Sequence, residues 1–206
     1  MHHARLLAAG TALALLAGCA GGNGFGGFGY YSLVRPAPDV VAHGTMEVTP
    51  TIPWNKASRT RYDIRREENW TLNGPLLDGL TFIGGLESGK RIVVQRRKAD
   101  RKVPNFRADM SPQDIASMIE SLYRIRAGAS EFAMTSLQPR DFLGHRGFQF
   151  DYDYLGGDEV TRRGRAVGAV IGGRFYLALF DATRMHYWDA GLPEFERIVA
   201  SARLRA

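Results

Sequence analysis

The alternation of hydrophobic and polar residues along the chain predicts a body built mostly of β-strands. The alternation is most regular over residues 147–155, where aromatic side chains occupy every second position and polar side chains separate them. Successive side chains of a strand point to opposite faces of the sheet, so this segment predicts a strand with one aromatic face. Asp151 and Asp153 fall together on its other face.

Shorter runs of β-branched and aromatic residues, bounded by glycine, proline or asparagine, predict further strands. Residues 160–171 and 174–180 are predicted to form a hairpin around Gly172-Gly173. Residues 80–83 and 91–95 are predicted to form a second hairpin, with a longer glycine-rich loop between them. Single strands are predicted at residues 45–49, 62–64 and 132–137.

Two segments predict helices. Ser111 can cap the free amide groups of a helix, Pro112 suits its first position, and hydrophobic residues at spacings of three and four follow up to Gly128. A second helix is predicted to begin at Leu192, with Phe195 on its buried side. Strands in meander order with two separated helices predict an α+β domain, in which two main helices cover an antiparallel β-sheet.

The start of the chain predicts export. Arg5 precedes an apolar run over residues 6–17, which is too short to span a bilayer as a helix, and small residues follow it. This pattern is typical of a secretory signal peptide. The last four residues of this segment, Leu-Ala-Gly-Cys ending at Cys19, resemble the lipobox of bacterial lipoproteins.

The lipobox resemblance implies that residues 1–18 are removed and that Cys19, the single cysteine of the chain, becomes its lipid-bearing first residue. In that family the sulfur receives a diacylglyceryl group and the new amino terminus receives an acyl group such as palmitate. Ala20, where the family's inner-membrane members have Asp, implies sorting to the outer membrane of a Gram-negative cell envelope, on its periplasmic face. The first expected partner is therefore a membrane, reached through the lipid anchor.

The chain divides into three parts by composition. Residues 1–18 are the predicted signal peptide. Residues 19–43, rich in glycine and then interrupted by prolines, are predicted to be a flexible tether behind the lipidated cysteine. Residues 44–206 are predicted to fold as a single domain, since a body of this length can bury a core without disulfides.

Three short motifs within this predicted domain resemble the PsbP-like family. They are the strand start at residues 142–150, the central strand at residues 172–182 and the closing helix with its tail at residues 195–204, where Ala202 stands at a position usually held by Phe. The resemblance implies a PsbP-like α+β fold. It also implies a role in protein–protein contacts or assembly, because no catalytic residue comes with these motifs.

The charge pattern points to an acidic partner. The formal net charge of the chain is +6 and the removal of residues 1–18 leaves +5, because Arg5 is the one charged residue lost. Five of the seven residues 96–102 are basic, and we expect this segment to bind an anionic surface such as anionic lipid, with a merely solvated loop as the alternative. Export argues against nucleic acid as a partner. The five residues are Arg96, Arg97, Lys98, Arg101 and Lys102.

Residues with catalytic or ligating chemistry are few. Asp151 and Asp153 share a strand face and could act as an acid–base pair or hold a divalent cation, although a solvated outer face explains them equally well. The run Gly84–Arg91 approaches a phosphate-binding loop, but Arg91 replaces the required hydroxyl and no helix follows. The histidines lack metal-ligand spacing and there is no second cysteine, so we expect neither a metal nor a cofactor.

The sequence therefore predicts a lipid-anchored envelope protein that acts as a non-catalytic binding or assembly module rather than an enzyme. Two alternatives stay open. One is a small envelope hydrolase that uses Asp151 and Asp153, and the other is a carrier of lipid or of a small ligand, which would need an apolar cavity. The tryptophans Trp54, Trp70 and Trp188 are predicted to be core residues.

Overall fold

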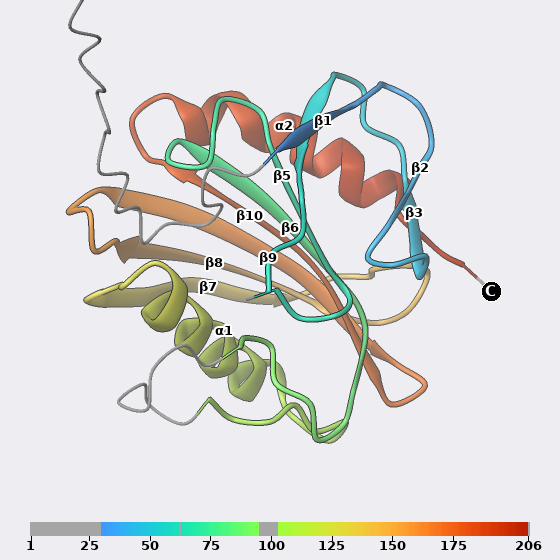
Figure 1. Cartoon of the computed structure of the whole chain (residues 1–206). Coiled ribbons are helices and arrows are strands. Elements are labelled where there is room, and N and C mark those ends of the chain that lie inside the picture. Colours follow the sequence, from blue (N-terminus) through green and yellow to red (C-terminus); the bar gives the residue numbers. More distant parts are fainter. Residues whose placement is uncertain (1–29, 62, 95–102, 206) are drawn as a thin grey trace, which may run out of the picture.

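The computed structural model describes residues 30–61, 63–94 and 103–205 (Figure 1). A large antiparallel sheet lies between two helices, α1 (Pro112–Arg126) and α2 (Tyr187–Ser201), one on each face. The predicted fold class, an α+β domain with two helices covering an antiparallel sheet, is confirmed.

Within the part of the chain that the structure describes, the large sheet has eight strands and the small sheet has three. Every neighbouring pair in both sheets is antiparallel. The order across the large sheet is β1 (Tyr31–Val34), β4 (Trp54–Ala57), β5 (Glu67–Thr71), β6 (Asp78–Glu87), β10 (Arg174–Thr183), β9 (Thr161–Ile171), β8 (Phe148–Leu155) and β7 (Glu131–Pro139). The order across the small sheet is β11 (Arg203–Leu204), β3 (Met46–Val48) and β2 (Asp39–Val41).

The central strand β10 divides the hydrophobic core into two layers. Leu177 and Leu179 pack in the cluster that contains α1, whereas Ala178 and Phe180 pack in the cluster that contains α2. Phe180 stacks on Phe195 of α2 with their ring centroids 5.6 Å apart. Because successive side chains of a strand point to opposite faces of the sheet, β10 contributes buried side chains to both layers.

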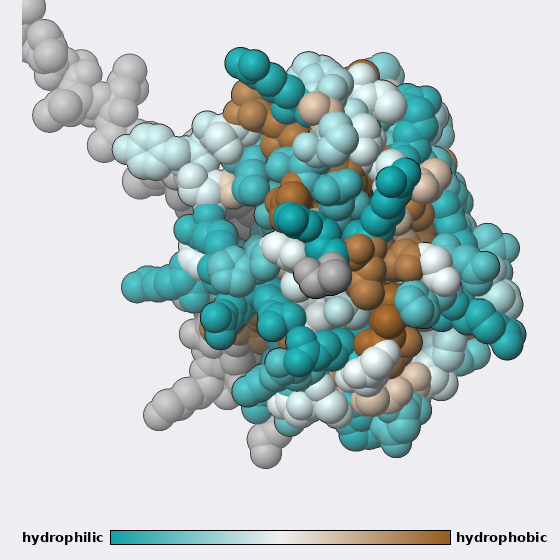
Figure 2. Space-filling model, turned by 90° about the vertical axis from the view of Figure 1, so that its right-hand side faces the viewer, coloured by the Kyte–Doolittle hydropathy of each residue, from teal (hydrophilic) through white to brown (hydrophobic). Residues whose placement is uncertain are grey.

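The small sheet lies at the same side of the molecule as the C-terminal end of the chain (Figure 1). Figure 2 looks at this side and shows hydrophobic residues in patches between hydrophilic ones. Leu204 of β11 is 38% exposed and Val40 of β2 is half-buried. The small sheet therefore covers the end of the α2 layer without closing it completely.

Most of the predicted elements are confirmed. The strands predicted at residues 45–49, 132–137, 147–155, 160–171 and 174–180 correspond to β3, β7, β8, β9 and β10. Helix α1 begins with a capping box, in which the Asp114 amide donates to the Ser111 hydroxyl at 3.2 Å and the Ser111 amide donates to the Asp114 carboxylate at 3.0 Å. Trp54, Trp70 and Trp188 are buried in the core, as predicted.

The second helix was predicted to start too late. It begins at Tyr187 and places Pro193 inside the helix. Trp188 explains the difference, because its ring stacks on Phe180 at 5.7 Å and is buried in the α2 layer. The packing of this first turn outweighs the cost of the amide that Pro193 lacks.

Two predicted strands are wrong. Residues 91–94 form no strand: Arg91 makes an isolated bridge to Asn105, and the residues that follow it turn into the α1 layer of the core. Residues 63–64 also form no strand, because the Ile64 amide donates to the Glu67 carboxylate at 3.1 Å and β5 begins only after that turn. Residue 62 lies outside the described residues.

The folded body begins before residue 44. The tether was predicted to reach His43, but β1 pairs with β4, and β2 pairs with β3. Val34 and Val41, one in each of these early strands, are buried in the α2 layer, and this burial holds the segment in the fold. Residues 19–29 of the predicted tether lie outside the described residues.

Candidate functional site

The glycine-rich stretch after residue 83 is a bulge in β6. Leu177 of β10 faces Ile83 and Phe175 faces Leu86, so Gly84 and Gly85 together oppose one residue of β10. The stretch was predicted to be a hairpin loop, and this interpretation is wrong. It is also no phosphate loop, because a strand rather than a helix contains it. Bulges bend strands and often lie next to binding sites.

Both glycines of the bulge are required by their surroundings. A Cβ on Gly84 would overlap the Thr45 hydroxyl and lie 2.8 Å from the Cβ of Ala42. Gly85 has a φ of +66° and a Cβ there would lie 2.6 Å from the Arg66 guanidinium. Only glycine combines the positive φ with this close approach. The bulge turns the Gly85 carbonyl toward Arg66, whose Nη1 donates to it at 3.3 Å.

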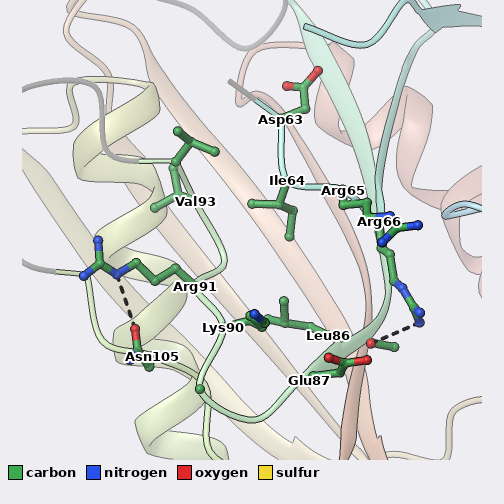
Figure 3. A pocket seen from close by; sticks show the side chains of 13 residues that line it. Asp63, Ile64, Arg65, Arg66, Leu86, Glu87, Lys90, Arg91, Val93 and Asn105 are labelled. Carbon is green, nitrogen blue, oxygen red and sulfur yellow. Dashed lines mark hydrogen bonds between the residues drawn. The ribbon is translucent and has the colours of Figure 1, made fainter. Parts of the chain in front are cut away.

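A pocket of about 880 Å³ opens beside the bulge (Figure 3). Figure 3 shows Lys90 and Glu87 along one side, Arg91 with Asn105 on a second side, and Arg65 and Arg66 on a third. The lining holds four basic and two acidic side chains around an apolar floor. Its residues are Asp63, Ile64, Arg65, Arg66, Gly85, Leu86, Glu87, Gly89, Lys90, Arg91, Val93, Val94 and Asn105.

The described lining of this pocket carries more basic than acidic side chains. Glu87 is paired with Arg174 at 3.5 Å, outside the pocket lining. Arg91 donates through Nε to the Asn105 side chain at 3.3 Å. Among the described residues, Arg65 and Lys90 form no ion pair. The pocket therefore offers two exposed cations to a ligand that carries negative charge.

A buried ion pair holds one wall of the pocket in place. Arg126 of α1 donates twice to the Glu67 carboxylate at the start of β5, and both side chains are buried. Burial alone would lower the pKa of Arg126, but the Glu67 carboxylate outweighs it and raises that pKa. Because Glu67 also accepts from the Ile64 amide at 3.1 Å, the pair fixes residues 63–66 against the helix.

The five basic residues predicted to bind an anionic surface lie outside the described residues, within the gap 95–102. The structure describes both ends of this gap. Val94 lines the pocket and Val103 is buried in the α1 layer. The Gly89 amide donates to the Phe106 carbonyl, and the Phe106 amide donates to the Lys90 carbonyl, each at 2.8 Å. These two bonds join the chain before the gap to the chain after it. The described chain before the gap therefore ends at Val94, in the lining of the pocket.

Sequence reasoning did not find the pocket itself. Its basic residues come from two dipeptides, Arg65-Arg66 and Lys90-Arg91, which lie 24 residues apart in the chain. Only the pairing of β5 with β6 brings them to one end of the sheet. The doubled arginine and the basic pair after Gly89 were the available signal, but neither indicates a site on its own.

The candidate catalytic pair is occupied by arginines. Asp151 and Asp153 share one face of β8, as predicted, and directly opposite them on β9 lie Arg165 and Arg163. Each guanidinium donates two hydrogen bonds to its carboxylate, at 2.7 Å for Asp151 and at 2.8 and 3.0 Å for Asp153. The bonds from Arg163 hold the pKa of Asp153 below its usual value.

A second group of polar side chains is fully buried under α1. The Tyr154 hydroxyl donates to Asp181 at 2.6 Å, the Tyr123 hydroxyl donates to it at 3.2 Å, and Tyr123 also contacts the Tyr152 hydroxyl. Burial raises the pKa of Asp181 to about 6. None of these residues lines the pocket beside the bulge. With partners for every member, the group forms a buried polar network in the core.

Two further properties of the described residues bear on function. No group of three or more histidine, cysteine, aspartate or glutamate side chains within them could hold a metal ion. None of their helices is long and apolar enough to cross a membrane.

The comparisons with known proteins identify the fold. The chain is similar in structure to the cyanobacterial PsbP protein CyanoP of Synechocystis, with a TM-score of 0.52 and 17% identity over 87% of this chain and 96% of that protein. The fold is therefore PsbP-like, which confirms the expectation drawn from the sequence motifs. A scan against protein-family models and a search of curated proteins find no match.

A second solved structure is a more distant neighbour. It is LpqN of Mycobacterium tuberculosis, described as involved in cell envelope biogenesis. The TM-score is 0.34 with 11% identity, over 88% of this chain and 87% of that protein. A score this low supports no conclusion about the present chain.

Proposed function

We propose that this chain is an envelope lipoprotein, held to a membrane through Cys19, that acts as a non-catalytic binding module and receives an anionic group of an envelope partner in the pocket beside the β6 bulge. The observation that carries the proposal is the pair of exposed cations in the pocket, Arg65 and Lys90, neither of which forms an ion pair with the residues that the structure describes. The resemblance of residues 16–19 to a lipobox, followed by Ala20, supports the proposal of a periplasmic position in the outer membrane.

The magnitude of the charge effect supports an anionic partner. Each basic residue next to an anionic surface contributes about 1 kcal/mol to binding at physiological ionic strength. The pocket lining has two more basic than acidic residues, and the segment 96–102 has four more, because Asp100 lies among its five basic residues. At about 1 kcal/mol for each net charge, this excess corresponds to a dissociation constant of roughly tens of micromolar for an acidic lipid surface or polymer.

The two alternative functions have less support. A hydrolase would need Asp151 or Asp153 free to exchange a proton, and both carboxylates are held by bidentate arginines. A carrier would need a largely apolar cavity, and the pocket beside the bulge is lined by six charged side chains.

The test is co-sedimentation of residues 30–206 with phosphatidylglycerol vesicles at low and high salt. The variant with Arg65→Gln and Lys90→Gln should bind more weakly than the unmodified chain at low salt. The matched control, Arg146→Gln with Arg205→Gln, removes the same charge from exposed positions that do not line the pocket. Equal losses in the two variants would show that only net charge matters and would contradict a role for the pocket.

A further inference from the structure

The end of the sheet opposite the pocket carries an apolar surface of its own. Strands β6 and β10 run side by side through the middle of the sheet, with Asp78 opposite Ala182 at one end and Glu87 opposite Arg174 at the other (Figure 1). The pocket lies at the Glu87 end. The apolar surface lies about 30 Å away, at the rise of a strand per residue, where the chain enters β6 and leaves β10.

This surface, which we call the Met185 surface, is a shallow hollow lined by six polar or charged residues, among them the paired Asp158 and Arg162, and by five apolar ones. The apolar residues are Leu76, Leu77, Val160, Met185 and Tyr187. Met185 is 86% exposed and Leu76 is 55% exposed, an unusual degree for large apolar side chains. Arg184 and Glu159 lie at its rim, and their charges are opposite. With Asp158 and Arg162 included, the lining holds two acidic and two basic side chains and carries no net charge around its exposed apolar residues.

The backbone holds Met185 outward by a strained turn. The Tyr187 amide donates to the Met185 carbonyl at 3.1 Å, and His186 between them has φ +81° and ψ −58°. This is a γ-turn of the rare, positive-φ kind, and a non-glycine residue at its centre costs free energy. Such strain persists only where the surrounding structure fixes it, so the exposure of Met185 is a built feature of the fold.

The loop that carries Leu76 is fixed as well. Asp78 accepts hydrogen bonds from the Leu72 amide at 2.7 Å and from the Asn73 amide at 3.0 Å. On the other side, Arg162 donates to the Leu76 carbonyl at 2.8 Å while its guanidinium also binds Asp158. Both exposed apolar side chains are thus presented by ordered segments, as a contact surface requires.

The position of the first described residues indicates what this surface contacts. Tyr31 lines a small cavity together with Pro75 and Asp78, so the chain enters the fold beside the loop that carries Leu76. Ten residues separate Cys19 from Tyr30, and covalent geometry limits this segment to about 40 Å. A lipid at Cys19 therefore keeps the Met185 surface within reach of the bilayer that holds the anchor.

We infer that the Met185 surface rests on the lipid surface of the anchoring membrane, with Met185 and Leu76 in contact with the acyl–headgroup boundary. The inference rests on the proposed anchoring at Cys19. It orients the molecule: the pocket beside the bulge faces away from the anchoring membrane, toward partners on the other side. Because the contact is apolar, it does not depend on salt, unlike the proposed anion binding.

The test uses the full chain reconstituted in phosphatidylcholine vesicles, with an environment-sensitive fluorophore on a single added cysteine. Lipidation blocks Cys19, so Met185→Cys and the control Ser88→Cys each give one labelled site. Ser88 is exposed and follows β6 at the opposite end of the sheet. The label at position 185 should shift to the blue, be quenched by a nitroxide carried on lipid and resist iodide in water. The label at position 88 should show the reverse.

Further fluorescence measurements distinguish a wrong orientation, contact with a second copy of the chain, and a missing lipid anchor. Adding Leu76→Asp to the Met185→Cys chain should return the label toward water, and high salt should leave the blue shift of the unaltered surface unchanged. Equal iodide access at positions 185 and 88 on chains that float with the vesicles would overturn the orientation and leave the anchor intact. Protection from iodide without quenching by the lipid nitroxide would assign the surface to a second copy of the chain and overturn the inference. Labelling of wild-type Cys19 in chains that do not float would overturn the anchor itself, and the inference with it.

Discussion

Asp151 and Arg165 face each other across β8 and β9, and Nε and Nη2 of the arginine each donate to one carboxylate oxygen at 2.7 Å. Arg165 also binds Glu196 of α2 at 2.8 Å, so the pair ties the sheet to the helix. An aspartate held in this way has both oxygens engaged by a permanent cation. It is suited to hold elements together and poorly suited to transfer protons.

The first prediction concerns these carboxylates. Replacing both with Asp151→Asn and Asp153→Asn should lower the free energy of unfolding by about 2 kcal/mol, because two partly buried bidentate pairs are weakened. Binding of the chain to anionic vesicles should not change. Denaturant unfolding measures the first effect, and Asp109→Asn, whose pair with Arg107 is exposed, is the control with an expected change near zero. A hydrolytic activity that the double variant abolishes would favour the hydrolase instead.

The second prediction is a pH dependence of stability that comes from Asp181. Its pKa is raised from 3.8 to about 6 in the folded chain, so between these values the folded chain holds a proton that the unfolded chain has lost. Stability therefore falls as pH rises through this window, by about 3 kcal/mol for a shift of this size. Asp181→Asn should lack this decline. Unfolding of both proteins from about pH 4 to about pH 7 tests it, and parallel profiles would show that Asp181 titrates normally.

The third prediction tests the bulge that shapes the pocket. Gly84→Ala should destabilise the fold by about 2 kcal/mol or more, because the added methyl group overlaps the Thr45 side chain and the neighbouring backbone is fixed in the sheet. Gly79→Ala in the same strand is the matched control. A Cβ there would meet only an ordinary contact at 3.5 Å, with Asp181, so the change should stay within about 0.5 kcal/mol. Similar midpoints of thermal unfolding for the two variants would contradict the close approach at Gly84.

The fourth prediction concerns the basic segment, whose structure is not described. Exchanging its five basic residues for Gln, at Arg96, Arg97, Lys98, Arg101 and Lys102, should weaken binding to anionic vesicles at low salt. The difference should fade at high salt, since the Debye length is about 8 Å at physiological ionic strength. Thermal stability should barely change, because exposed charges contribute little to folding. If the altered chain co-sediments as well as the original at low salt, the segment is an ordinary solvated loop.

Local sequence signals predicted the elements that depend on local interactions. The aromatic alternation of β8 and the capping residues Ser111 and Asp114 of α1 involve neighbours within a few positions, and both elements are as predicted. The early strands β1 and β2 were missed because a glycine- and proline-rich surrounding has weak β-propensity. What holds them is burial of Val34 and Val41 against residues far along the chain.

The candidate site depends almost wholly on contacts between residues that are far apart in the sequence. The bulge needs Thr45 beside Gly84, and the pocket wall needs Arg126 to reach Glu67, 59 residues away. No spacing rule in the sequence connects such residues. Sequence reasoning thus predicted a positively charged segment at residues 96–102 but could not predict the pocket that Val94 lines, because the pocket is created by strand register.

Lipid attachment at Cys19 is the claim on which the proposed location, partner and orientation all depend. The measurement that tests it most directly compares wild type with Cys19→Ser by membrane fractionation and by the mass of the isolated chain. The wild type should remain with membranes until detergent is added, with residues 1–18 removed and acyl chains on Cys19. The serine variant should be released or stay as the full-length precursor, because a hydroxyl cannot replace the thioether. A serine variant that is still processed and still needs detergent for release would contradict the account.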